Sequence, residues 1–154
     1  MKTTEEKLAV LSAVAHELNR RSIVWAVGAS LLLYFRRIVP DFHDIDLMVR
    51  EEDADRLRDA LLSLGELLPG PGEPYKTRCF LRFLIDGVEV DAIGGMVITR
   101  SGVDYDCPFT AEHVAGYATV NGERIPLQSL SDWRSCYELM GRTEKVELID
   151  RHKV

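Results

Sequence analysis

The sequence contains few of the residues typical of secreted, zinc-binding or membrane proteins. Its three cysteines, Cys79, Cys107 and Cys136, are odd in number and widely spaced, which fits neither a disulfide framework nor a zinc motif and suits a reducing compartment. No apolar run approaches the roughly 18 residues of a membrane span. The first ten residues, MKTTEEKLAV, are too charged for a signal peptide. We therefore expect a soluble, cytoplasmic protein that binds no membrane.

Positive charge and histidine are also scarce. Lysine and arginine total 19 against 25 acidic residues, giving a formal charge of −6. This balance argues against a surface for long duplex nucleic acid, although a local basic pocket could still bind a small polyphosphate. The four histidines are not spaced as a pair, which disfavours a phosphohydrolase with histidine metal ligands.

The rest of the composition is that of an ordinary globular protein. Apolar residues make up 46% and charged residues 29% of the 154 residues, and we find no internal repeat. This length predicts a single domain over 1–154, with a core at about 20–95 and a C-terminal hairpin and helices at about 110–154.

The apolar periodicity and turn signals predict a mixed order of helices and strands. Thr3 and Glu6 have capping-box spacing ahead of an amphipathic stretch. Asp86-Gly87 and Asn121-Gly122 each lie between two strand-like runs and predict hairpins. The expected order is a helix over 4–20, a strand over 22–27, a short helix from Gly28, a strand over 45–49, a helix over 50–65 with Gly65 as its C-cap, a loop over 67–76, the first hairpin, an irregular stretch over 94–109, a short helix over 110–116, the second hairpin and C-terminal helices. This order predicts an α+β or mixed α/β fold, with one partly antiparallel central sheet flanked by helices.

Two carboxylates stand at the start of one predicted strand, in HDIDLMV. Asp44 and Asp46 are two residues apart, so they share a face of the strand, while Ile45 and Leu47 pack on the other. Carboxylates this close repel each other unless a cation lies between them, and oxygen ligands suit Mg²⁺ or Mn²⁺. A short D-x-D pattern is also common in turns, where the acids cap the backbone or face water.

Two further features favour the metal interpretation. Asp91, in VEVDAI, would complete a triad of carboxylates if its strand lies beside that of Asp44 and Asp46. Gly28, Ala29 and Ser30 stand between a strand and a helix, where small residues and free N–H groups can approach an anion. Each feature alone is open to a plainer reading, as an edge-strand acid or a helix N-cap.

Taken together, these stretches resemble a known superfamily. VGAS, a short helix, HDIDLMV and then VEVDAI are similar to the nucleotidyltransferase fold shared by DNA polymerase beta and small antibiotic nucleotidyltransferases. A basic residue and a histidine just before the acidic pair resemble the lincosamide-modifying and abortive-infection toxin-type members. The tail, PLQSLSDWRSCYELMGRTEKVELI, resembles the C-terminal helices of stand-alone members. The resemblance covers about residues 20–150, and its specific parts are 28–46 and 88–93.

The resemblance implies a role for each matching residue. Gly28, Ala29 and Ser30 would contact the phosphates of a nucleoside triphosphate, although many members have a second glycine where this chain has Ala29. Asp44 and Asp46 would bind Mg²⁺ or Mn²⁺. Asp91 would complete the site as a metal ligand or as the base that deprotonates the acceptor. The reaction would transfer a nucleoside monophosphate to a hydroxyl and release pyrophosphate.

Several basic residues have open roles. Arg36 and Arg37 could neutralise triphosphate charge or suit a helix C-terminus, and His43 could orient a phosphate or face water. Three residues near the first hairpin, Lys76, Arg78 and Arg82, could line the same cleft. Two more, Arg142 and Lys145, stand at a predicted helix break, where solvent exposure is the default.

The acceptor is not readable from the sequence. A small molecule, a protein or an RNA end all remain open, as does a homodimer or an antitoxin partner. The main alternative is a nucleotidyltransferase-fold module with weak or no catalysis, such as a toxin–antitoxin component.

Overall fold

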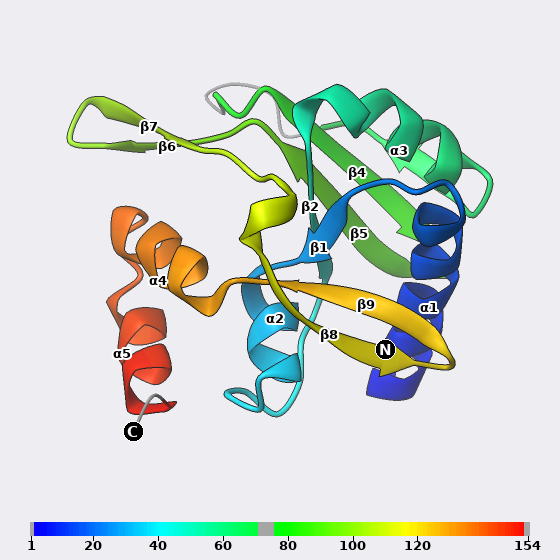
Figure 1. Cartoon of the computed structure of the whole chain (residues 1–154), viewed down its shortest axis with the longest axis horizontal. Helices are drawn as coiled ribbons and strands as arrows, with labels where there is room; N and C mark the ends of the chain where they lie inside the picture. The colour runs from blue at the N-terminus through cyan, green and yellow to red at the C-terminus, as the bar shows by residue number, and fades with distance from the viewer. Residues whose placement is uncertain (1, 71–75, 153–154) are drawn as a thin grey trace.

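A mixed sheet of seven strands organises the computed structural model, which describes residues 2–70 and 76–152 (Figure 1). The helices are α1 (Thr4–Arg20), α2 (Ala29–Phe35), α3 (Ala54–Leu62), α4 (Leu130–Leu139) and α5 (Thr143–His152), with 3₁₀ turns at Glu51–Asp53 and Ala111–His113. The strands are β1 (Trp25–Val27), β2 (Ile45–Val49), β3 (Glu66–Leu68), β4 (Cys79–Ile85), β5 (Val88–Gly94), β6 (Met96–Arg100), β7 (Val103–Cys107), β8 (Val114–Val120) and β9 (Glu123–Gln128). The predicted α+β class is confirmed.

The strand order puts the acidic strands in the middle of the sheet. It runs β3-β4-β5-β2-β1-β9-β8, and β6 and β7 form a separate two-stranded ribbon. β2 pairs with β5 in parallel and with β1 in antiparallel orientation, and β4 pairs with β5 in antiparallel orientation. β2 and β5 therefore both have neighbours on each side, which fixes the position of any side chain they carry.

Three hairpins close with two-residue turns in which both residues have positive φ. These angles are 48° and 78° at Asp86-Gly87, 51° and 80° at Asn121-Gly122, and 51° and 77° at Ser101-Gly102. Such turns match the twist of the flanking strands, and they favour Asn or Asp followed by Gly. The two predicted hairpins are confirmed. The third, which joins β6 and β7, replaces the irregular stretch expected over 94–109.

Two helix predictions need correction. The helix expected over 110–116 is only a 3₁₀ turn, because β8 begins at Val114 and pairs with β9. The helix expected over 50–65 is shortened to α3, and its C-cap is Ser63. Gly65 instead allows a close approach, because a Cβ there would lie 2.3 Å from the carbonyl oxygen of Leu84. The predicted loop over 67–76 begins inside β3, and residues 71–75 lie outside the described residues.

The helices lie in two groups. α1, with the predicted capping box between Thr3 and Glu6, packs against α3 and against β8 and β9. α4 packs against α2, α5 and β6, so α4 and α5 stand beside the sheet below the projecting β6–β7 hairpin (Figure 1). Trp25 and Trp133, expected in the core, are 1% and 2% exposed. None of the helices described is long and apolar enough to cross a membrane.

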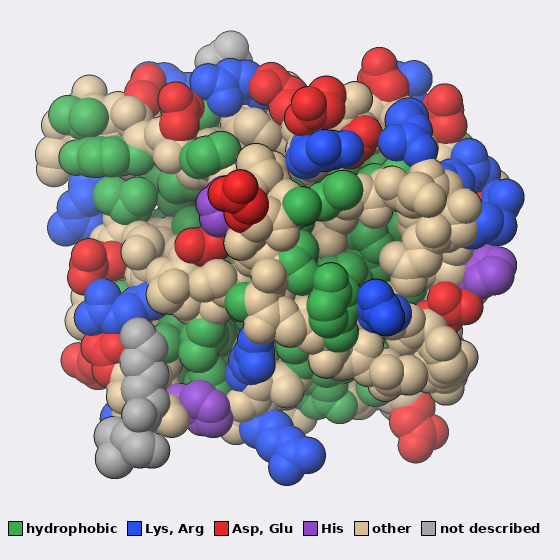
Figure 2. Space-filling model, viewed as in Figure 1, with side chains coloured by type: hydrophobic (Ala, Val, Ile, Leu, Met, Phe, Trp, Pro, Cys, Tyr) green, Lys and Arg blue, Asp and Glu red, His purple; other side chains and the backbone are tan. Residues whose placement is uncertain are grey.

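The two strands of the β6–β7 hairpin differ in how far they expose their apolar side chains. Val103 and Tyr105 on β7 are 51% and 41% exposed, whereas Met96 and Ile98 on β6 are buried. In the space-filling view, hydrophobic side chains gather at the upper left, over this hairpin (Figure 2). β6 thus turns its apolar side chains inward, toward the space between the sheet and α4.

Candidate active site

Strand register brings the three predicted carboxylates to one place. Asp46 on β2 is the direct partner of Asp91 on β5, and partners on adjacent strands point to the same face. Asp44 stands two residues before Asp46 and shares that face. The intervening Ile45 and the following Leu47 are fully buried on the other face. β2 therefore has one acidic face and one face that packs in the hydrophobic core.

These carboxylates line a cleft of about 530 Å³ between the sheet and α4 and α5. Its size is within the range that holds one small-molecule ligand. The lining residues are Ala29, Ser30, His43, Asp44, Asp46, Thr77, Phe80, Arg82, Asp91, Ile93, Met96, Val97, Ile98, Trp133, Tyr137, Met140, Arg142 and Lys145. The cleft therefore has an acidic floor on the sheet and a basic and apolar wall on the helices and β6.

Mutual repulsion and burial perturb the acidic floor. Burial, and then the negative charges of Asp91, Asp44 and Glu89, raise the pKa of Asp46 from its ordinary 3.8 to about 7. Burial and the charge of Asp91 also raise the pKa of Asp44. Arg82 opposes both shifts but does not cancel them. A cation bound between these carboxylates would lower their pKa values, because it would stabilise their ionised forms.

Arg82 is the cation that the fold itself supplies. Its guanidinium donates hydrogen bonds of 3.0 and 3.5 Å to the two carboxylate oxygens of Asp91, and it lies 2.7 Å from Glu89 Oε1. The hydrogen bond to Asp91 is the main reason that the pKa of Arg82 is raised. Because the two-residue turn at Asp86-Gly87 fixes the β4–β5 register, Arg82 must face Asp91.

The remaining donors fit a hard divalent cation. The carboxylates of Asp44 and Asp46 make no hydrogen bond or ion pair with any residue described, so their oxygens are available. In the described ranges no three His, Cys, Asp or Glu side chains are grouped so that they could hold a metal ion. Asp91 is paired with Arg82. Oxygen donors of this kind match Mg²⁺ or Mn²⁺. Asp44 and Asp46 are thus the carboxylates that could bind a divalent cation directly. Asp91 could bind it only if its ion pair with Arg82 were broken or shared.

The Gly28-Ala29-Ser30 segment joins β1 to α2 beside these acids. Gly28 donates its backbone N–H to the carbonyl oxygen of Asp46 at 3.0 Å, which fixes the start of α2 against β2. A Cβ on Gly28 would lie 2.5 Å from Nε1 of Trp133, so only glycine lets α4 pack this closely. Ala29 has φ of 52°, a conformation that favours glycine. Ala29 and Ser30 line the cleft, and Gly28 lies behind them against Trp133.

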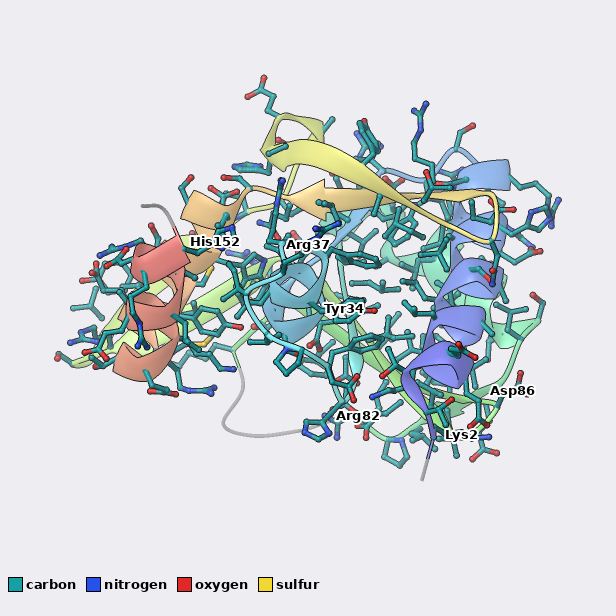
Figure 3. The ribbon with its side chains drawn as sticks, turned by 90° about the horizontal axis from the view of Figure 1, so that it is seen from below. Lys2, Tyr34, Arg37, Arg82, Asp86 and His152 are labelled. Atoms are coloured by element: carbon teal, nitrogen blue, oxygen red, sulfur yellow. The ribbon has the colours of Figure 1, made fainter. Side chains whose placement is uncertain are left out.

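The structure does not bring Arg36 and Arg37 to the cleft. Arg36 donates a hydrogen bond to the carbonyl oxygen of Ala115 at 3.3 Å, and Arg37 lines a separate cavity with Tyr34. Figure 3 shows Arg37 and Tyr34 at α2, well apart from Arg82. The helix α2 ends before these arginines and carries them away from the carboxylates. His43, by contrast, is exposed and lines the cleft.

Other basic residues lie where the arginine pair was expected. Arg142 and Lys145, which follow the break after α4, line the cleft on its helix side. The guanidinium of Arg142 donates a hydrogen bond of 2.8 Å to Glu144. Their place depends on the packing of α4 and α5. The signals in the sequence were basic charge next to Gly141 and the resemblance of this tail to the C-terminal helices of stand-alone nucleotidyltransferases. Lys76 and Arg78, by contrast, pair with Asp104 and Asp106 on β7 and do not line it.

Comparison with known proteins gives structural matches alone. No protein-family profile and no curated protein sequence matches the chain. A candidate nucleotidyltransferase from Thermotoga maritima matches with a TM-score of 0.70 and 25% identity, over 94% of this chain and 90% of that one. The antibiotic-resistance factor ANT(2'')-Ia matches with a TM-score of 0.63 and 12% identity, over 97% and 90%. The lincosamide antibiotic adenylyltransferase LnuA, bound to lincomycin, matches with a TM-score of 0.59 and 11% identity, over 94% and 96%. The chain therefore has the fold of a small nucleotidyltransferase, as the sequence resemblance predicted.

Proposed function

We propose that the chain is a divalent-metal-dependent nucleotidyltransferase that moves a nucleoside monophosphate from a nucleoside triphosphate to a hydroxyl group and releases pyrophosphate. The observation that carries the proposal is the pairing of Asp46 with Asp91 on adjacent strands, with Asp44 on the same face of one cleft. The fold shared with nucleotidyltransferases supports it.

The acids on the floor have distinct tasks. Asp44 and Asp46 would hold Mg²⁺ or Mn²⁺, whose charge would offset the burial and the mutual repulsion that raise the pKa values of the two carboxylates. When bound, the ion neutralises and orients the phosphates of the nucleotide. Asp91 serves as a further ligand or accepts the proton of the attacking hydroxyl. Arg82 positions Asp91 and stabilises its negative charge.

The residues around the floor bind the rest of the triphosphate. Ser30, at the start of α2, offers a hydroxyl donor on one side of the carboxylates. Arg142 and Lys145 offer positive charge from the helix wall. We assign them the role that the sequence suggested for Arg36 and Arg37. His43, at the mouth of the cleft, completes this set.

The acceptor is proposed only as a class. One structural neighbour, ANT(2'')-Ia, was solved with adenylyl-2''-tobramycin, and LnuA was solved with lincomycin. Each of these names a small molecule, so small hydroxyl compounds are the first acceptors to test for this chain. A protein or RNA hydroxyl is the next class.

Thermal unfolding with each of the four nucleoside triphosphates tests the proposal. With Mg²⁺, at least one triphosphate should raise the melting temperature of the wild type, because a ligand at 100 times its dissociation constant stabilises the native state by about 2.7 kcal/mol. Asp44→Ala and Asp46→Ala should lose the metal-dependent part of this shift. A wild type with no affinity for metal or nucleotide would instead support a binding module without catalysis.

A further inference from the structure

One tyrosine on the helix side of the cleft is buried almost completely and still lines the cleft. Tyr137 on α4 is 4% exposed and is one of the lining residues. It follows Trp133 by four residues, about one helical turn, so both side chains lie on the same face of α4. Trp133 packs closely against Gly28, which brings this face of α4 against the start of α2. Tyr137 is therefore part of a closely packed wall of the cleft.

The ring and the backbone of Tyr137 are held by neighbouring groups. Its ring centroid lies 5.5 Å from that of Trp133, and the indole N–H of Trp133 donates to Gln128 Oε1 at 2.8 Å. The guanidinium of Arg142 lies 5.9 Å from the centroid of the tyrosine ring. The backbone N–H of Arg142 also donates to the carbonyl oxygen of Tyr137 at 2.8 Å. These contacts fix the direction of the ring but do not use its hydroxyl.

The hydroxyl of Tyr137 is a free hydrogen-bond donor. It makes no hydrogen bond with any residue that the structure describes. The fully buried side-chain atoms without a partner in these ranges are Nε of Arg21 and Nε of Arg36, so the tyrosine oxygen keeps some exposed surface, which lies at the cleft. Burial, and then the negative charge of Asp46, raise the pKa of Tyr137 to about 12. The hydroxyl is therefore protonated at neutral pH, within electrostatic range of Asp46.

An acceptor for this hydroxyl is missing within the described part of the chain. A tyrosine hydroxyl in a nearly buried side chain usually has a hydrogen-bond partner. Asp46 is not that partner, because no hydrogen bond joins the two side chains, although both line the same cleft. A ligand that satisfies the hydroxyl must bring an oxygen acceptor and must tolerate the neighbouring carboxylates. A phosphate oxygen on the metal ion of Asp44 and Asp46 meets both conditions.

We propose that the hydroxyl of Tyr137 donates a hydrogen bond to a phosphate oxygen of the bound triphosphate, from the side of the cleft opposite the acidic floor. The inference rests on the proposed function, since it assumes that phosphates lie beside the carboxylates. Arg142, next to the same ring, supplies positive charge on a flexible side chain. The hydroxyl instead supplies a donor of fixed direction, because the ring that carries it is packed against Trp133.

Calorimetric titration of Tyr137→Phe tests this donor, because the substitution removes one hydroxyl and keeps the ring. The probes are inorganic tripolyphosphate and ATP, each with Mg²⁺ present. Tyr137→Phe should weaken the binding of both probes by about 10- to 150-fold, equivalent to about 1.5–3 kcal/mol for a hydrogen bond to a charged group. Without ligand, the variant should unfold at the wild-type temperature, since the hydroxyl has no partner to lose among the described residues.

Tyr34→Phe is the matched control, because Tyr34 is also partly buried but lines the separate cavity beside Arg37. This variant should bind both probes as the wild type does. Wild-type affinity of Tyr137→Phe for tripolyphosphate would overturn the phosphate contact, even if ATP binding were weakened, because the hydroxyl would then contact the sugar or the base. A loss of affinity matched by an equal loss of ligand-free stability would also overturn it, since the hydroxyl would be a structural group. A wild type that binds neither probe would overturn the proposed function and the role of Tyr137 together.

Discussion

The cleft has a sheet wall, which consists of the acidic floor and Arg82, and a helix wall on α4 and α5. The two walls are held in place in different ways. The sheet wall, with Asp46, Asp91 and Arg82, is fixed by backbone register in the middle of a seven-stranded sheet. The helix wall, with Arg142 and Lys145, depends on how α4 and α5 pack. A register cannot shift by one residue without turning every side chain to the other face, whereas packed helices can adjust. We therefore expect the sheet wall to carry the chemistry and the helix wall to tune binding.

Removing charge from the sheet wall should have the largest effect. Asp44→Asn or Asp46→Asn should lower nucleotidyl transfer by at least about 10³-fold, because each change removes a carboxylate that, in the proposed function, binds an ion stabilising several kcal/mol of developing charge. Release of pyrophosphate with a responsive acceptor measures this rate. Transfer at the wild-type rate in both variants would show that the chemistry does not take place at these acids.

Asp46→Asn should make the metal-free protein more stable. Because the pKa of folded Asp46 is about 7, above its ordinary 3.8, the native state binds more protons between these values and loses stability as the pH rises through them. Asp46→Asn removes this loss, so its free energy of unfolding should exceed that of the wild type by about 1–4 kcal/mol above pH 7. Near pH 3 the gap should close. Denaturant unfolding at several pH values measures the difference, and a gap that is independent of pH would contradict the raised pKa of Asp46.

The contact between Gly28, at the start of α2, and Trp133 on α4 should tolerate even a small added side chain poorly. Gly28→Ala places a Cβ 2.5 Å from the indole of Trp133, and such overpacking costs about 1–3 kcal/mol. Combining it with Trp133→Phe, which provides a smaller ring, should reduce the added cost of the alanine. Chemical denaturation of the single and double variants gives the coupling. An equal cost of Gly28→Ala in both backgrounds would show that this contact does not restrict position 28.

Neutralising the helix wall should have the smallest effect. Arg142→Ala and Lys145→Ala should each weaken triphosphate binding by about 5- to 30-fold, since charge-assisted contacts at a partly exposed site are worth about 1–2 kcal/mol. Arg151→Ala, on the exposed side of α5 outside the cleft lining, is the control. Arg36→Ala and Arg37→Ala should also leave the affinity unchanged. A larger loss from the Arg36 and Arg37 variants than from Arg142 and Lys145 would favour the sequence-based assignment.

The sheet wall could be predicted from the sequence because its signals are local. Asp-x-Asp in a strand fixes a shared face, and Asp86-Gly87 fixes a hairpin, from which even the pairing of Arg82 with Asp91 could have been predicted. The parallel pairing of β2 with β5 could not, because it joins strands separated by α3, β3 and β4.

The basic residues of the helix wall could not be predicted from local patterns. Arg36 and Arg37 precede the acidic pair in the chain, yet the turn after α2 carries them away from it, while Arg142 and Lys145 reach the cleft from the far end of the chain. Ser101-Gly102 is a weaker hairpin signal than Asp-Gly or Asn-Gly, so the β6–β7 hairpin was missed. These positions depend on tertiary packing, which no local pattern specifies.

The most direct test of the carboxylate site is the titration of Asp46 itself. NMR detection of its carboxyl carbon gives the pKa with and without Mg²⁺. Without the ion, the pKa should be near 7, and saturating Mg²⁺ should lower it strongly, because the ion binds the ionised form. An ordinary pKa near 4 that does not respond to Mg²⁺ would show that the acids neither repel one another nor hold a divalent cation.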